Sequence, residues 1–318
     1  MKIYKTTVTN PYFNLASEQY LLDTEEDDVF MLWRNEKSVI IGRNQNAYAE
    51  INRRFTEENS IAVVRRLTGG GAVFHDVGNI NYSFIMKKGG ARALDFAAFC
   101  APIIDALRTL GVPAELSGRN DLTANGRKFS GNAQCIYNGR VLHHGTILFS
   151  ADMSSMAEAL NPDVEKMKSN GVKSVRARVC NLNEFLPDMS VLQLKEYLEK
   201  SVAGTVTQFS EEQINGINKL KTEKYETWEW NYGKSKQYGK TVKKRFPFGT
   251  VELSYTAEHG VLTEVKIYGD YFGVKPVSEL EKSLVGKKLK RDELTAALSD
   301  VAGFIHGAEP EQIAELFE

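Results

Sequence analysis

Apolar residues recur at helical spacing in several parts of the chain. In the segment Asp95–Leu110 they return every three or four residues, and Gly111 follows the last of them. This period places the apolar side chains on one helix face, and glycine is common just after a helix. Asn10-Pro11 precedes a similar pattern and predicts a helix that begins at Pro11. Further helices are predicted near residues 47–58, 152–160, 191–202 and 211–220.

Short β-type runs bounded by polar residues predict strands at residues 29–33, 38–42, 61–65, 72–75 and 81–86. The polar residues 34–37 suit a hairpin between the first two strands. Asn125-Gly126 and Asn138-Gly139 each lie between β-type runs, and the Asn-Gly pair tolerates the positive φ angles of tight hairpin turns. We therefore predict a meander of strands over residues 121–149.

The order of elements changes near residue 240. Strands at 250–255 and 261–267 flank the turn Glu258-His259-Gly260, and helices follow at 277–284, at 291–303 and after Pro310. Strands followed by helices predict a small separate domain. The glycine-, serine- and lysine-rich residues 233–239 are the candidate linker. We therefore expect a larger domain over residues 1–240 and a smaller one over 241–318.

Composition and charge narrow the class of protein. The chain has 318 residues, and its 40 Lys and Arg against 41 Asp and Glu give a net charge of 40 − 41 = −1. With 42% hydrophobic and 25% charged residues, it has the composition of a globular protein. The balanced charge argues against nucleic acid as a partner. No apolar run is long enough to span a bilayer and the start lacks a secretory signal, so we expect a cytoplasmic protein without membrane association.

The histidines and cysteines do not indicate a metal site. Three widely spaced cysteines form neither a disulfide framework nor a CxxC pair, and the five histidines include no HExxH arrangement.

Three successive glycines, Gly69–Gly71, follow Arg65 and Arg66 between two predicted strands. Glycine has no side chain to block a ligand, so the backbone N–H groups of such a loop can approach a phosphate. Arginine adds donors that suit phosphate or carboxylate. The pattern is neither a P-loop nor GxGxxG. A flexible hairpin turn is the alternative interpretation, and the two arginines favour an anion site.

Two later segments carry further polar chemistry. Lys128 lies between Gly126 and Gly131 on a predicted strand edge, where its ammonium could serve a phosphate or a developing oxyanion. The alternative is a solvated hairpin face. His143-His144 lie on a predicted strand and should therefore point to opposite faces of the sheet, where a structural role is the more common one.

These segments, in this order, resemble the lipoate–protein ligase A family. The resemblance is carried by residues 65–76 with Gly78-Asn79, by 118–122, 128–133 and 143–146, and further by 32–34, 41–46, 174–179 with Asn181-Leu182, and 227–233. Each piece alone is weak. Together they cover nearly the whole chain in one order, which makes the resemblance specific.

The resemblance implies an α/β (α+β) fold: a biotin/lipoate-ligase-type mixed sheet flanked by helices, with a small C-terminal α+β accessory domain. It also implies a two-step reaction. Lipoate and ATP, usually with Mg²⁺, give lipoyl-adenylate and pyrophosphate. The acyl group then passes to a lysine of a lipoyl domain, in an acyltransferase subunit of an oxoacid dehydrogenase or in the H protein of glycine cleavage.

The resemblance also assigns roles to residues. Lys128 would touch both the lipoate carboxyl group and the phosphate and act as the catalytic residue. Because the first step brings two anions together, the site must supply positive charge to the transition state. Asn79 and Asp121 are candidates for phosphate or metal contacts, and residues 168–183 resemble a loop that closes over the adenylate. The residues expected to contact ATP are Arg66, Gly70, Gly71, Ala72, Val73 and Phe74.

Two other functions remain open from the sequence. The first is an ATP-independent octanoyl or lipoyl transferase with a cysteine acyl-enzyme, for which Cys180, after Arg176 and Arg178, is the candidate; Cys100 and Cys135 are predicted to be buried. The second is a non-catalytic carrier-binding or biotin-type regulatory protein, which ranks last because no basic recognition helix is visible.

The acyl pocket is expected to be apolar, with Leu32, Trp33, Val73 and residues near Tyr82 as its walls. Such a pocket discriminates weakly between lipoate and octanoate.

Overall fold

The computed structural model describes residues 1–87, 95–160, 178–232 and 239–317. Its centre is a mixed sheet of eight strands, in the spatial order β11 (Thr205–Thr207), β1 (Lys2–Lys5), β2 (Val29–Trp33), β6 (Asn79–Lys87), β10 (Arg140–Leu148), β9 (Arg127–Tyr137), β8 (Asp121–Ala124) and β7 (Ala114–Ser117). Strand β1 is parallel to both of its neighbours, and all other neighbouring strands of this sheet pair antiparallel.

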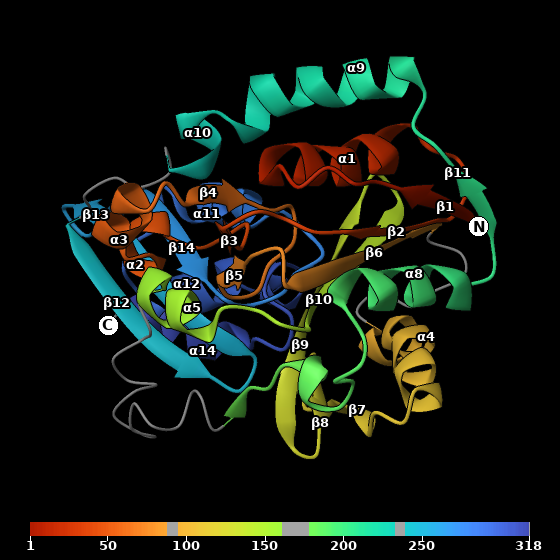
Figure 1. Ribbon diagram of the computed structural model, residues 1–318. Coiled ribbons are helices and arrows are strands. Elements are labelled where there is room, and N and C mark those ends of the chain that lie inside the picture. Colours follow the sequence, from red (N-terminus) through yellow and green to blue (C-terminus); the bar gives the residue numbers. More distant parts are fainter. Residues whose placement is uncertain (88–94, 161–177, 233–238, 318) are drawn as a thin grey trace.

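Helices cover both faces of this sheet (Figure 1). Along β2, Met31 and Trp33 pack with α1 (Pro11–Thr24), whereas Phe30 and Leu32 pack with α4 (Phe96–Thr109) and α8 (Val191–Ser201). This division follows from the alternation of side chains along a strand. Outside α1 lie α9 (Glu211–Leu220) and the turn of π-helix η2 (Lys221–Tyr225). The predicted mixed sheet flanked by helices is confirmed.

A second, three-stranded sheet has the order β4 (Ala62–Arg65), β3 (Ser38–Ile41), β5 (Val73–His75). The predicted hairpin between residues 29–33 and 38–42 is wrong, because β2 pairs with β1 and β6 while β3 pairs with β4 and β5. The connection between them is not a solvent turn. Asn35 is fully buried there and accepts a hydrogen bond from Asn14 Nδ2 at 2.9 Å. The short helices α2 (Ala47–Glu50), α3 (Arg53–Glu58) and α5 (Met153–Ala159) adjoin this sheet.

The predicted turns and helix ends are confirmed where local residues decide them. Asn125 and Gly126 have φ of 50° and 74°, and Asn138 and Gly139 have 49° and 73°, as tight hairpins between β8, β9 and β10 require. The side chain of Asn10 caps α1 by accepting the backbone N–H of Phe13 at 2.9 Å.

Residues 239–317 build a core of their own. An antiparallel sheet of β12 (Lys240–Phe246), β13 (Gly249–Glu258) and β14 (Val261–Gly269) packs against α11 (Val277–Leu284), α12 (Arg291–Ala297), α13 (Val301–Phe304), α14 (Pro310–Ala314) and η3 (Glu315–Phe317). The single helix predicted over 291–303 is wrong: the chain turns between Leu298 and Asp300, and both Leu298 and Val301 remain fully buried. Residues 233–238 of the candidate linker lie outside the described residues.

Arg65, at the end of β4, joins parts of the chain that are far apart in sequence. Its buried guanidinium donates to the carbonyl oxygens of Gly42 and Gln45 at 2.8 and 2.7 Å. It also donates to Trp230 and Asn231 of α10 (Trp228–Asn231) at 3.0 and 2.8 Å. Burial lowers the pKa of Arg65 to about 10. The side chain therefore holds α10 against the small sheet.

We expect Arg65→Met to lower the free energy of unfolding by about 3 kcal/mol or more, because it leaves several buried carbonyl groups without donors. Urea denaturation followed by circular dichroism measures this. Arg54→Met is the matched control, since that side chain is 87% exposed, and its unfolding midpoint should not change. Equal midpoints for the two variants would contradict this role of Arg65.

Candidate active site

The glycine loop, residues Gly69–Gly71, connects β4 to β5 and is shaped by Arg66. The Arg66 guanidinium is buried; its Nη2 donates to the carbonyl oxygens of Gly69 and Gly71 at 2.6 and 2.8 Å, and its Nη1 donates to Ile40 O at 3.1 Å. Burial lowers the pKa of Arg66 to about 10. The loop carbonyls therefore turn inward toward a cation, and Gly70, with φ of 89°, allows the bend.

Only one end of this loop faces open space. A Cβ atom at Gly69 would lie 2.4 Å from the carbonyl oxygen of Tyr271, and one at Gly70 would lie 3.3 Å from the ring of Phe272. A Cβ atom at Gly71 would meet nothing within 4 Å. The glycines at 69 and 70 thus allow close packing against the C-terminal domain, and Gly71 leaves room for a ligand.

The residues after the loop divide between surface and core. Ala72 and Val73 are half-buried, whereas Phe74 is buried in the core of the small sheet with Val39 and Ile41. Of the residues expected to contact ATP, Phe74 can therefore offer only its backbone.

Lys128 lies near the start of β9, with its Nζ 2.7 Å from Asp121 Oδ1 of β8. Its side chain is 41% exposed, so the ammonium can reach a bound molecule. A Cβ atom at Gly131 would lie 3.3 Å from Lys128 Nζ, so the glycine leaves room for the lysine to lie along β9. The structure thus brings together Lys128, Asp121 and Gly131.

Of the segment predicted to close over the adenylate, residues 168–183, the structure describes 178–183, and these residues start beside Lys128. The backbone N–H of Cys180 donates to Lys128 O at 2.9 Å, and Val179 forms a parallel bridge to Lys128. Residues 168–177, including Arg176 and the first four residues of the 174–179 motif, lie outside the described residues.

The glycine loop and the Lys128 region both reach β10. His144 Nε2 lies 2.7 Å from Thr68 Oγ1, immediately before the glycine loop. Two residues further along β10, Thr146 Oγ1 accepts the backbone N–H of Gly131 at 3.1 Å. Residues two apart on a strand are separated by roughly 7 Å. The two motifs therefore approach neighbouring positions of one strand.

Asn79, at the start of β6, is fully buried. Its Nδ2 donates to Asn81 Oδ1 at 2.9 Å, and its Oδ1 has no hydrogen-bond partner among the described residues. A buried oxygen without a donor is costly, so this atom suits a contact to a ligand group or cation. The described residues contain no group of three or more His, Cys, Asp or Glu that could hold a metal ion.

The predicted walls of the acyl pocket lie on two faces of the sheet. Trp33 and Val73 pack on the α1 side, where the His144 ring also lies. Leu32 and Tyr82 pack on the α4 side. These four residues cannot line one pocket, because adjacent strand residues point in opposite directions.

Two features of the site were not predicted from the sequence. Glu18 of α1 is 2% exposed, and its Oε1 lies 2.9 Å from His144 Nδ1. No pattern in the sequence indicates it, because α1 carries other polar residues, among them Gln19 and Asp23. The ring of Phe272 packs on the glycine loop with the Arg119 guanidinium 4.4 Å above it. No local pattern indicates that contact, because it joins residues from two domains.

All three cysteines are buried and unpaired, as predicted for Cys100 and Cys135. Burial raises the pKa of Cys100 to about 11 and that of Cys135 to about 12. The pKa of Cys180 is also raised, mainly by burial, and its Sγ lies 3.6 Å from Arg127 O. A raised pKa keeps a thiol protonated, which makes it a poor nucleophile.

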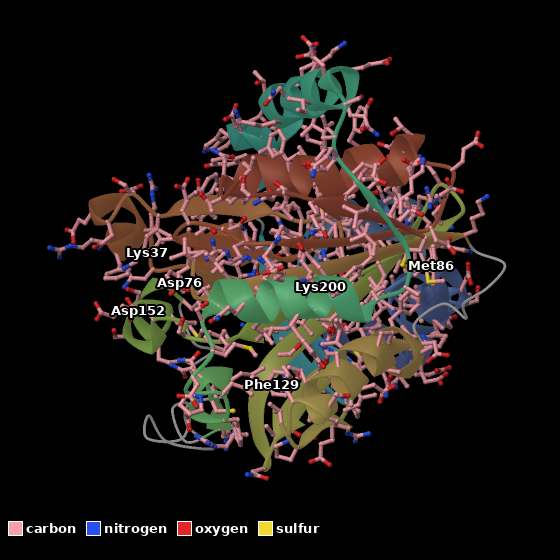
Figure 2. The ribbon with its side chains drawn as sticks, turned by 45° about the vertical axis from the view of Figure 1, so that its right-hand side comes forward. Lys37, Asp76, Met86, Phe129, Asp152 and Lys200 are labelled. Carbon is pink, nitrogen blue, oxygen red and sulfur yellow. The ribbon has the colours of Figure 1, made fainter. Side chains whose placement is uncertain are left out.

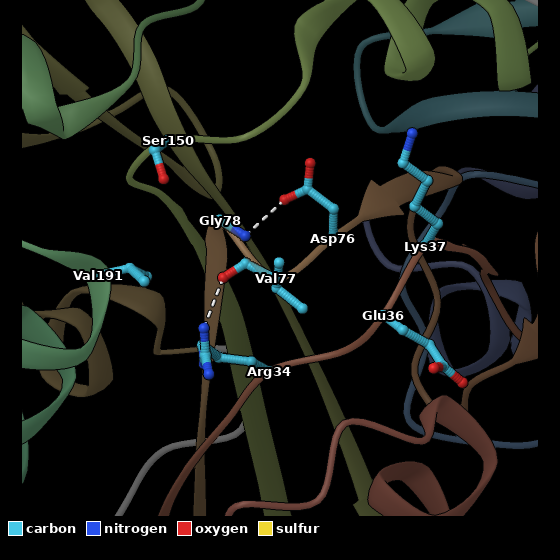
Figure 3. Close-up of a pocket in the computed structure, with 8 residues that line it drawn as sticks. All are labelled: Arg34, Glu36, Lys37, Asp76, Val77, Gly78, Ser150 and Val191. Carbon is cyan, nitrogen blue, oxygen red and sulfur yellow. Dashed lines mark hydrogen bonds between the residues drawn. The ribbon is translucent and has the colours of Figure 1, made fainter.

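A pocket of about 430 Å³ contains none of the predicted site residues. Figure 3 shows its lining, in which Arg34 Nη1 donates to Val77 O at 2.8 Å and the backbone N–H of Gly78 donates to Asp76 Oδ1 at 2.8 Å. Lys37 and Asp152, whose charged groups are 3.4 Å apart, lie beside Asp76 (Figure 2). Its polar groups thus bond largely to one another.

We expect Gly70→Ala to lower the free energy of unfolding by about 1–3 kcal/mol, because alanine is strained at a positive φ and its Cβ would lie 2.9 Å from Arg66 Nη2. Gly71→Ala, the matched control, should stay within about 0.5 kcal/mol of the parent. Urea denaturation compares the two variants. Equal losses would show that Arg66 does not fix this loop conformation.

The chain is similar in sequence to known proteins. Residues 10–203 match the family described as "Lipoyl protein ligase A/B catalytic domain", and residues 235–317 match "Bacterial lipoate protein ligase C-terminus". The chain is 42% identical to a lipoate-protein ligase, LplJ, of Bacillus subtilis (strain 168), with 92% of each chain covered. It is 39% identical to lipoate–protein ligase 1 of Staphylococcus aureus (strain Mu50), with 94% of this chain and 93% of that one covered.

Solved structures that are similar to this chain also include lipoate ligases. P. falciparum LipL1, crystallised in complex with lipoate, is similar with a TM-score of 0.80 at 26% identity, over 94% of each chain. A bipartite lipoate protein ligase from Thermoplasma acidophilum, studied with its E2 lipoyl domain, has a TM-score of 0.64 at 26% identity, over 75% of this chain and 98% of that one. A lipoate-protein ligase A bound with ATP has a TM-score of 0.62 at 25% identity, over 73% and 98%. No helix in the described part of this chain is long and apolar enough to cross a membrane.

Proposed function

The chain belongs to the lipoyl protein ligase A/B family, and on this premise we propose that it activates lipoate with ATP and transfers the lipoyl group to a lysine of a lipoyl domain. The observation that carries the proposal is the approach of the glycine loop and the Lys128 region to neighbouring residues of β10. Similar proteins have been crystallised with lipoate and with ATP.

In the first step a lipoate carboxylate oxygen attacks the α-phosphorus of ATP, and pyrophosphate leaves. Both reactants are anions, so a cation that gains strength as they meet accelerates the step. Lys128 fits this role, because its ammonium is half-exposed and held by one carboxylate, Asp121. In the second step the acceptor amine attacks the acyl carbonyl and AMP leaves, and the same ammonium would polarise that carbonyl.

The nucleotide would bind at the open end of the glycine loop. Gly71 borders open space there, and Ala72 and Val73 are partly exposed. Gly70 and Phe74 would contribute only their backbone groups. Arg66 would act mainly by fixing the loop, since its donors already bind backbone carbonyls.

Mg²⁺ would join the site with the phosphates of ATP. This ion is usually held by one or two carboxylates together with substrate phosphates, and it requires no larger protein cluster. Asp121 offers a carboxylate, and the unpaired Asn79 Oδ1 offers a buried neutral oxygen. The ion would neutralise phosphate charge beside the Lys128 ammonium.

We propose as acceptors the acyltransferase subunits of oxoacid dehydrogenases and the H protein of glycine cleavage. A similar archaeal ligase was studied with an E2 lipoyl domain, which supports this class of partner. Octanoate is an alternative acyl substrate, because apolar pockets separate such chains weakly. Because the reaction consumes ATP, we place the protein in the cytoplasm, and we propose domains at residues 1–240 and 241–318.

We expect Lys128→Ala to lower the rate of lipoyl-adenylate formation by about 10²-fold or more, the scale of a lost electrostatic stabiliser. Pyrophosphate release with lipoate and ATP measures this rate. The control is Lys200→Ala, since that side chain is 70% exposed on α8 (Figure 2) and forms an ion pair with Glu196 of the same helix at 2.7 Å. A near-parental rate for purified, folded Lys128→Ala would refute the assignment.

We expect Cys180→Ser to retain most activity and transfer to a lipoyl domain to require ATP, because the Cys180 thiol is buried with a raised pKa. Intact-protein mass spectrometry distinguishes the ligase from a cysteine transferase. A thioester formed from an octanoyl carrier without ATP, and lost in Cys180→Ser, would establish the transferase instead.

A further inference from the structure

A series of buried hydrogen bonds runs from helix α1 to the glycine loop. Glu18 Oε1 lies 2.9 Å from His144 Nδ1, His144 Nε2 lies 2.7 Å from Thr68 Oγ1, and Arg66 Nε donates to Thr68 Oγ1 at 3.0 Å. Arg66 then donates to the loop carbonyls. All four residues are less than 9% exposed.

The donors and acceptors along this series are mutually consistent. The Glu18 carboxylate accepts the Nδ1–H of His144, which leaves His144 Nε2 to accept the hydroxyl proton of Thr68. The Thr68 oxygen is then free to accept the Nε–H of Arg66. Ser83 Oγ fixes the far end by donating to Glu18 Oε1 at 2.6 Å. Each side chain therefore has one favoured orientation.

We propose that Glu18 is a positioning residue for the nucleotide side of the site, acting through His144 and Thr68 on Arg66 and the glycine loop. The proposal rests on the ATP-dependent function proposed above. It assigns a role in nucleotide binding to a carboxylate that lies on α1, on the far side of His144 from the loop.

The physical argument concerns the orientation of Arg66. A guanidinium has five donors in a fixed plane, so the bond at Nε sets the direction of both Nη groups. If Thr68 loses its partner His144, or His144 loses Glu18, the guanidinium of Arg66 keeps its bond to Ile40 O, but the bond at its Nε is no longer fixed in direction. The plane of Arg66 can then tilt, which weakens its bonds to the carbonyls of Gly69 and Gly71 and shifts the loop amides. Charge-assisted hydrogen bonds of this kind are about twice as strong as neutral ones.

Two variants test the proposal at different points of the hydrogen-bond series. Glu18→Gln keeps the shape of the side chain but removes the charge, and Thr68→Val keeps the shape but removes the hydroxyl. We expect each to raise the dissociation constant for ATP by about tenfold in calorimetry, and the double variant to be little worse than either one, because both break the same series. Thr68→Ser restores a hydroxyl and should bind ATP as the parent does.

The control is Gln19→Met, next to Glu18 on the same helix. Gln19 accepts hydrogen bonds from Tyr225 and Lys224, which are not part of the hydrogen-bond series from Glu18 to Arg66. Its loss should lower the thermal stability and leave ATP affinity unchanged. If Glu18→Gln binds ATP within twofold of the parent, or if only the KM for lipoate rises, the positioning role is wrong.

A second readout does not depend on the proposed function. Hydrogen–deuterium exchange of the peptide that contains Gly69–Gly71 should be faster in Glu18→Gln and Thr68→Val than in the parent, and unchanged in Gln19→Met. Unchanged exchange in the first two variants overturns the positioning role. A parent protein that binds no ATP while the loop exchange changes as expected would overturn only the proposed function.

Discussion

The buried guanidinium of Arg66 is the group on which the shape of the site depends. Burying a cation without partners is costly, and here carbonyl oxygens of β3 and of the glycine loop supply the partners. The same bonds bend the loop, whose open end lies at Gly71. The shape of the loop is thus fixed by a cation that faces the protein interior.

Strand β10 relates this loop to the rest of the chemistry through the alternation of its side chains. His143 stacks on Phe99 of α4, with ring centroids 5.0 Å apart, and belongs to the core of that face. His144 points to the α1 face, toward Glu18 and Thr68. Thr146, two residues later, binds the backbone of β9 near Lys128. One strand therefore sets the spacing between the Lys128 region and the glycine loop.

The sequence predicts those features that neighbouring residues decide. Asn-Gly pairs specify the hairpins of the meander, and Asn10 specifies the start of α1, because each acts on its own backbone. Strand partners depend on distant residues, so the pairing of β2 and β3 was predicted wrongly. The same limit applies to the site: the glycine loop and Lys128 are visible as motifs, whereas the bonds from Glu18 to His144, 126 positions apart, exist only in the folded chain.

We propose that the glycine loop and Lys128 form one site for an ATP-dependent acyl activation. ATP-dependent pyrophosphate release by the purified protein, with lipoate, octanoate and biotin offered separately, tests this proposal. We expect release with lipoate, some release with octanoate and none with biotin. Release with biotin alone, or lipoyl transfer that proceeds without ATP, would contradict it.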